Sequence, residues 1–149
     1  MTLTACNNLT RWRHRWPDAL AGLLIGAYVA TFAWLALMRH ASFDSAGFDL
    51  GVYDQVVCIT VPAPTLIYTA TGQPLLHLSN HASPILLLIA PLYLVYSGPQ
   101  TLLVVQAAAV GLGGLPLFWF ARERLAPPQG ILVGLSLLSA YLLFPPLQV

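Results

Sequence analysis

Apolar residues occur along this chain in long blocks, separated by a single polar stretch. Residues 19–38 contain no charged side chain, and a helix of that length spans about 30 Å, the thickness of a bilayer's hydrocarbon core. Three further apolar runs follow at 84–97, 101–121 and 130–147. The pattern predicts an all-α, polytopic membrane protein with three to four transmembrane helices, in which 19–38 is the first.

The composition agrees with a membrane protein and excludes a soluble enzyme or nucleic-acid binder. Hydrophobic residues make up 58% of the chain and charged residues only 7%, whereas a soluble domain carries about 25% charged residues. A cleaved signal peptide is the alternative for 19–38. Its apolar core would be about 7–15 residues long and a small-residue cleavage site would follow, but here Arg39 and His40 follow. We therefore expect an uncleaved first span.

The basic residues predict the orientation of this span. Three of the six arginines lie within 11–15, and basic residues flanking a first span favour the cytoplasm. We expect 1–18 to be cytoplasmic and 39–83 to form an outer loop.

The run 84–97 is short and contains Pro91, so it either crosses as a kinked helix or re-enters on the same side. If it crosses, there are four spans and Arg122 and Arg124 lie outside. If it re-enters, these arginines lie inside, as positive residues prefer. Four crossings are favoured here, because the first helix usually dominates. The chain stops at Val149 beside an apolar run, and we expect it to be part of a longer protein.

Two glycine pairs have the spacing of close helix contacts in membranes. They are Gly22 with Gly26, and Gly130 with Gly134. In a glycine-rich apolar chain the same spacing also arises easily by chance.

The outer loop contains three of the five acidic residues, three of the four histidines and a predicted amphipathic helix. Phe48, Val52, Val56 and Ile59 share one face within about 80°, which predicts a helix over 48–59 that lies on the membrane surface or under the bundle.

Two aspartates in this segment are candidates for chemistry. On a regular helix Asp49 and Asp54 lie about 140° apart, so both cannot face one substrate. If Asp49 instead precedes the helix as its N-cap, the two aspartates could face one substrate. The structural alternatives are a helix cap for Asp49 and a solvated face for Asp54.

Two histidines and two cysteines complete the candidate chemistry. His77 and His81 have a spacing that suits metal ligands on a helix, but Pro74 and the missing third ligand argue against a metal. Cys6 and Cys58 lie on opposite sides of the first span in this topology and cannot pair within one chain. The sequence has no nucleotide-binding glycine loop and no hydrolase or zinc-protease motif.

Short motifs stand in order between 45 and 147: Phe-Asp-Leu-Gly-Val-Tyr-Asp-Gln from Phe48, His-Ala-Ser-Pro-Ile-Leu-Leu-Leu from His81, Ala-Pro-Leu-Tyr from Ala90, and Leu-Pro-Leu-Phe from Leu115. In these motifs the chain resembles a family of predicted prokaryotic multi-pass membrane proteins, a domain of unknown function grouped with the GT-C glycosyltransferases. Those enzymes have more spans, so the resemblance covers only their N-terminal part.

The resemblance implies transfer of a sugar from a polyprenyl-phosphate donor on the outer face. Many GT-C enzymes carry Asp-Glu-x-x-Tyr in the first outer loop; Asp49 and Tyr53 match it, and Leu50 stands in place of the Glu. This implies Asp49 as the catalytic base, with Asp54, Tyr53 and His81 binding substrate. The expected partners are the lipid bilayer and the donor, without nucleic acid. The cofactor stays unknown: a divalent cation is compatible, and the sequence requires none.

The alternative is a non-catalytic membrane protein, either a transporter-like component or an inactive fragment. Charged residues inside the spans would favour transport. The runs 19–38, 84–97 and 101–121 contain none, which favours chemistry in the outer loop.

Overall fold

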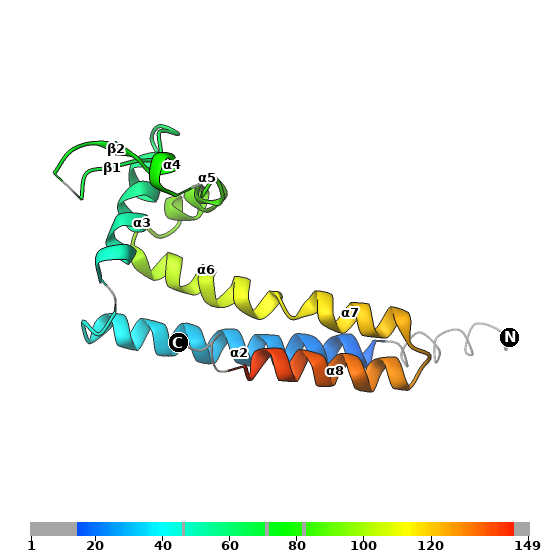
Figure 1. Cartoon of the computed structure of the whole chain (residues 1–149). Helices are drawn as coiled ribbons and strands as arrows, with labels where there is room; N and C mark the ends of the chain where they lie inside the picture. The colour runs from blue at the N-terminus through cyan, green and yellow to red at the C-terminus, as the bar shows by residue number, and fades with distance from the viewer. Residues whose placement is uncertain (1–14, 46, 71, 82, 145–149) are drawn as a thin grey trace, which may run out of the picture. The chain divides into compact units, whose positions relative to one another are not determined.

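A computed structural model describes residues 15–45, 47–70, 72–81 and 83–144 (Figure 1). Helices dominate it, as the sequence predicts, so the all-α fold class is confirmed. The chain divides into two compact units, which are described separately. The helical unit comprises Met1–Ala33 with Ala107–Val149, and the loop unit comprises Trp34–Gln106.

The first long helix is α2, Trp16–Ala41. Pro17 suits its first turn because proline has no N–H to leave unpaired, and Asp18 near the start and Arg39 near the end complement the helix dipole. By length and composition, α2 and the stretch Pro99–Arg124 could each cross a membrane. The charge-free run at 19–38 therefore predicted helix α2 correctly.

The second long stretch is broken in the middle. It consists of α6, Pro99–Leu112, and α7, Leu115–Arg124, and Pro116 lies in the first turn of α7. Helix α8, Gln129–Leu142, follows, and the Tyr141 hydroxyl donates a hydrogen bond of 3.0 Å to the Val110 carbonyl at the break.

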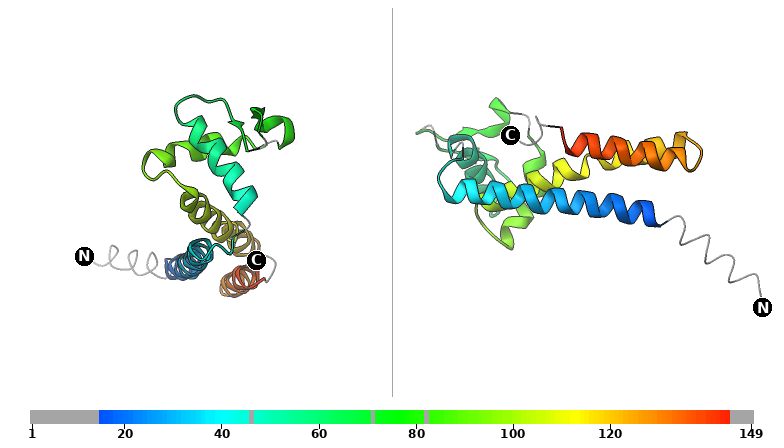
Figure 2. Two further views of the ribbon diagram at one scale, coloured as in Figure 1. Left: turned by 90° about the vertical axis from the view of Figure 1, so that its left-hand side faces the viewer. Right: turned by 90° about the horizontal axis from the view of Figure 1, so that it is seen from below.

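Within the helical unit, α2 and α7 run in opposite directions. Asp18 at the start of α2 forms an ion pair with Arg122 at the end of α7. Farther along, a side chain at Gly111 would meet Val29 and Tyr28. Helix α8 packs along α7 (Figures 1 and 2). The buried core of this unit is formed by Ala21, Ile25, Tyr28, Phe118, Leu138 and Leu142.

The two glycine pairs differ sharply in their surroundings. A Cβ at Gly130 would lie 2.7 Å from the Leu125 carbonyl oxygen, and one at Gly134 would lie 2.9 Å from that of Phe118. Nothing lies within 4 Å of a Cβ at Gly22 or Gly26. Only the second pair makes a close contact between the described helices, α7 with α8.

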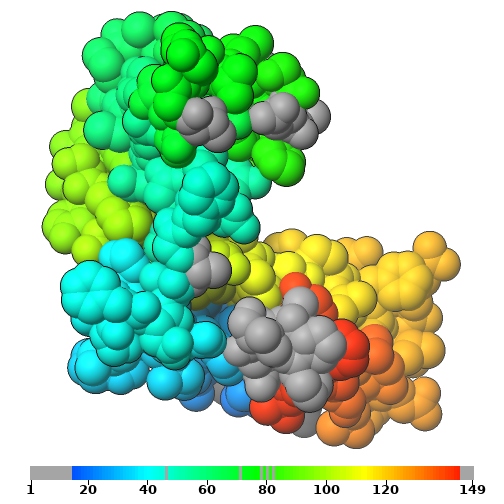
Figure 3. Space-filling view, turned by 60° about the vertical axis from the view of Figure 1, so that its left-hand side comes forward, coloured from blue at the N-terminus to red at the C-terminus, as the bar shows by residue number. Residues whose placement is uncertain are grey.

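The loop unit surrounds α3, Gly47–Thr60. Strands β1, Ile67–Tyr68, and β2, Leu75–Leu76, form a short antiparallel hairpin in which Ile67 pairs with Leu76. The short helices α4, His77–Asn80, and α5, Ile85–Ile89, follow, and then the 3-10 helix η1, Ala90–Leu94. The hairpin lies within the predicted outer loop, after the predicted helix. In space-filling form the cyan-to-green residues of this unit pack closely together (Figure 3).

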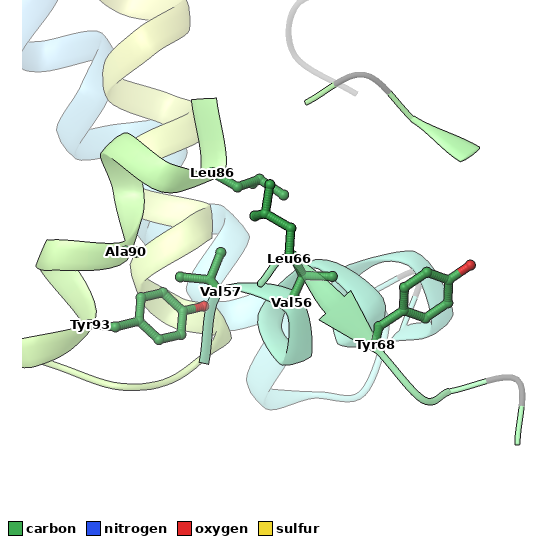
Figure 4. Close-up of a cluster of buried hydrophobic side chains, with 7 residues drawn as sticks. All are labelled: Val56, Val57, Leu66, Tyr68, Leu86, Ala90 and Tyr93. Carbon is green, nitrogen blue, oxygen red and sulfur yellow. The ribbon is translucent and has the colours of Figure 1, made fainter. Parts of the chain in front are cut away.

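The apolar run at 84–97 folds into this unit. Leu86, Ala90 and Tyr93 are buried with Val56 and Val57 of α3, together with Leu66 and Tyr68 (Figure 4). The helical segment Ile85–Leu94 has 10 residues and, at about 1.5 Å per residue, is too short to span a bilayer alone. The number of crossings stays a prediction.

The predicted helix over 48–59 is confirmed. Of its predicted apolar face, Val56 is buried inside the loop unit, whereas the Phe48 side chain is 68% exposed. The other buried positions of α3 are Val57 and Thr60, because α5, η1 and the hairpin pack over the C-terminal half of this helix. Contact of the exposed first turn with the membrane surface stays a prediction.

Candidate functional site

A cavity of about 210 Å³ opens beside the first two turns of α3. Three of the four predicted site residues line it, namely Asp49, Tyr53 and His81. The other lining residues are Phe48, Val52, Tyr68 and His77. The structure therefore gathers most of the predicted site, and adds aromatic and imidazole groups to it.

Asp49 and Tyr53 reach the cavity from the same face of α3. They are four residues apart, and residues at that spacing are neighbours on a helix surface. Asp49 lies inside the first turn of α3, so the N-cap position expected for it is wrong. A carboxylate in a first turn still lies at the positive end of the helix dipole.

The opposite wall of the cavity comes from the hairpin and from α4. The His77 backbone N–H donates a hydrogen bond of 2.7 Å to the Leu66 carbonyl, which anchors the start of α4 to the chain before β1. The His77 ring centroid lies 5.2 Å from that of Tyr53, 6.0 Å from that of Tyr68 and 5.6 Å from that of His81. Three rings thus surround one imidazole.

His77 is fully buried, and neither ring nitrogen has a hydrogen-bond partner among the residues that the structure describes. Burial lowers the pKa of the His77 imidazole below its usual 6.5, and the charge of a protonated His81 lowers this pKa further. The imidazole is therefore neutral near pH 7. In the described part of the chain no three His, Cys, Asp or Glu side chains are placed to hold a metal ion.

Asp54 lies away from this cavity. Its carboxylate accepts a hydrogen bond of 2.7 Å from the Tyr93 hydroxyl, which connects α3 with η1. It borders a separate, open depression together with Gly51, Gln55 and Cys58. As expected for one regular helix, Asp49 and Asp54 face different surroundings, so the structure does not bring all four predicted site residues together.

Two polar contacts hold the hairpin against α3. Gln55 donates through Nε2 to the Thr69 hydroxyl at 2.7 Å and accepts from the Thr69 backbone N–H at 3.0 Å. At the end of α3, the Thr60 hydroxyl oxygen accepts from the Leu66 N–H at 3.2 Å. These bonds position the strand that brings Tyr68 to the cavity.

Sequence reasoning missed Tyr68, and it considered His77 only as a metal ligand. The spacing of His77 and His81 was the available signal for a shared site. Tyr68 gave no such signal, because only the hairpin pairing brings it near α3.

Long apolar helices joined to a loop unit with a polar cavity define a helical membrane protein. The model of a family described as a predicted membrane protein (DUF2079) matches residues 39–147. The chain belongs to this family, and the match includes every residue of the cavity. The predicted membership of an uncharacterised membrane-protein family is confirmed. No curated protein and no solved structure matches the chain.

Proposed function

We propose that this protein is a membrane glycosyltransferase, or part of one, that takes a sugar from a polyprenyl-phosphate donor on the outer face of a prokaryotic plasma membrane. The observation that carries the proposal is the position of Asp49 on a cavity lined by tyrosine and histidine rings, in the loop that follows the first span. The charged residues of the two long apolar helices lie near their ends, which also favours chemistry in the loop.

The chemistry assigned to Asp49 is that of a general base. Its carboxylate takes the proton of an acceptor hydroxyl while that oxygen attacks the anomeric carbon of the donor. The bond between this carbon and the phosphate oxygen breaks, and polyprenyl phosphate leaves with the electron pair. Tyr53 and His81 bind substrate in this proposal. Asp54, which accepts a hydrogen bond from Tyr93, positions α3 and so acts on the site only indirectly.

We also propose three crossings, with the loop unit outside. The ion pair between Asp18 and Arg122 supports this arrangement, because it joins the start of the first long helix to the end of the second. These two ends then lie on one side of the membrane, and Arg122 and Arg124 are cytoplasmic like the N-terminal arginines. The run 84–97 stays on the outer side with the cavity.

Cysteine labelling in intact cells tests the crossings. In a background with Cys6 and Cys58 replaced by Ser, we expect a membrane-impermeant thiol reagent to label Gln73→Cys and not Glu123→Cys. Permeabilised cells should label both and serve as the control. Labelling of Glu123→Cys in intact cells would support four crossings instead.

Turnover of a lipid-linked sugar by the purified protein in liposomes tests the chemistry. We expect Asp49→Asn to lower the rate by about 10²–10⁴, the usual loss when a general base is removed. Asp44→Asn is the matched control, because Asp44 is exposed and pairs only at 3.6 Å with Arg39. Unchanged turnover in Asp49→Asn would refute the assignment, and loss of folded Asp49→Asn protein would show a structural role.

A further inference from the structure

The His77 side chain combines complete burial, at 0% exposure, with ring nitrogens that have no hydrogen-bond partner among the described residues. Buried polar atoms are nearly always satisfied, since leaving one unpaired is costly. A residue that only filled space here could be apolar, so the imidazole requires another explanation.

The size of the adjoining cavity limits what could supply the missing partner. Its volume is about 210 Å³, and an apolar cavity of about 150 Å³ in another protein accommodates benzene. There is room for one six-membered ring with small substituents. The walls offer the ring faces and edges of Tyr53 and Tyr68 and the side chain of Val52, against which the flat face of such a ring can pack.

The polar groups of the cavity favour a neutral, hydroxylated ligand. Asp49 contributes a carboxylate, which repels a phosphate group. A neutral imidazole has one donor and one acceptor nitrogen, and a hydroxyl group likewise donates and accepts. The low pKa of His77 keeps the imidazole in this neutral form.

We propose that His77 is a substrate-binding residue that hydrogen-bonds a hydroxyl of a single sugar ring held in the cavity between Asp49, Tyr53 and Tyr68. This inference rests on the proposed glycosyl transfer and names a residue for sugar recognition in the same site. His81 is the exposed neighbour of His77, with ring centroids 5.6 Å apart. The proposal requires the His81 ring to move aside so that the ligand hydroxyl can reach the buried nitrogens.

Binding to the unaltered protein is the first test. The protein is labelled with ¹⁵N-histidine in lipid nanodiscs and titrated with the methyl glycosides of glucose, galactose, mannose and N-acetylglucosamine. We expect at least one glycoside to shift both ring-nitrogen resonances of His77 and to leave those of His40 unchanged. Cyclohexanol, inorganic phosphate and Zn²⁺ are the competing probes. The proposal is overturned if no glycoside shifts His77, or if phosphate or Zn²⁺ does so instead.

Substitutions separate recognition from a structural role. We expect His77→Phe to weaken glycoside binding about tenfold or more, the loss typical of one hydrogen-bonding group, while the melting temperature of the unliganded protein is kept or raised. His77→Gln should restore part of the binding, and His40→Gln is the matched control. Unchanged binding in His77→Phe, or a lower melting temperature in both His77 variants, would overturn the proposal.

The two proposals fail in different experiments. Glycoside binding that depends on His77, without any turnover of a lipid-linked sugar, would leave the recognition role intact and refute the transferase. Turnover that depends on Asp49 but is unchanged in His77→Gln and His77→Phe would refute the recognition role and leave the transferase intact.

Discussion

The helical unit and the loop unit are each stabilised internally, but by different interactions. In the helical unit, α7 and α8 approach so closely that a methyl group at Gly130 would meet a carbonyl oxygen. In the loop unit, hydrogen bonds join elements far apart in sequence, such as Asp54 to Tyr93 and Gln55 to Thr69. Close packing of small residues suits lipid, where apolar burial drives little association, whereas directional polar bonds can hold a cavity open beside water.

The comparison also shows where unsatisfied polar groups are tolerated. Among the described residues, the buried side-chain nitrogens without a partner both belong to His77, in the loop unit. Functional sites commonly keep such local costs because their groups are prepared for a ligand. The loop unit thus gives up some stability at the cavity, which its polar contacts and core offset.

The largest effect on the free energy of unfolding is expected for a substitution at Gly130, where the helical unit leaves no space for a side chain. Gly130→Ala places a Cβ 2.7 Å from the Leu125 carbonyl oxygen, so α8 must shift, at a cost of about 1–3 kcal/mol in the free energy of unfolding. Gly26→Ala is the control and should stabilise by about 0.5–1 kcal/mol, since nothing obstructs its Cβ. Reversible unfolding in lipid measures both. Equal effects of the two substitutions would show that close contact does not hold the helical unit.

A smaller effect is expected when a polar bond of the loop unit is removed. Tyr93→Phe deletes the donor to Asp54, and we expect a loss of about 1–2 kcal/mol in the free energy of unfolding. Tyr96→Phe is the control, because Tyr96 is exposed. If Asp54→Ala and Tyr93→Phe are additive in a double-mutant cycle, the hydrogen bond contributes nothing and the contrast between the units fails.

The smallest effect is a pH dependence confined to the loop unit. Unfolded His77 takes up a proton near its usual pKa of 6.5, whereas folded His77 does so only at lower pH. The unfolded state then binds more protons. The free energy of unfolding therefore has its full value above about pH 6.5 and decreases as the pH falls below it. Denaturant titrations at several pH values should show a weaker fall in His77→Phe. A fall of equal size in that variant would attribute the effect to other groups.

Local patterns in the sequence predicted the main helices. A charge-free run located α2, and an apolar stripe located α3. Asp49, Tyr53 and His81 do line one cavity. Helix spacing places the first two on one face of α3, whereas the family resemblance, and no local pattern, implied that His81 belongs to the same site.

What the sequence left open or missed has a common physical origin. In the run 84–97, Leu86, Ala90 and Tyr93 pack against α3, and composition cannot distinguish burial in protein from burial in lipid, so a crossing by this run stays a prediction. The two glycine pairs have the same spacing, yet only Gly130 and Gly134 face another helix. The face of α3 and the position of Tyr68 depend on the hairpin, whose pairing no local pattern specifies.

The break between α6 and α7 has a consequence for biosynthesis. Pro116 has no N–H to donate to the carbonyl four residues before it, that of Leu112. Lipid cannot satisfy a backbone carbonyl, so the broken segment would enter the membrane poorly alone. At the same break the Val110 carbonyl accepts from the Gly113 N–H at 3.1 Å and also from the Tyr141 hydroxyl of α8. We expect the insertion machinery to release residues 99–142 into the bilayer as one helical hairpin, with the last helix adding a hydrogen bond at the break.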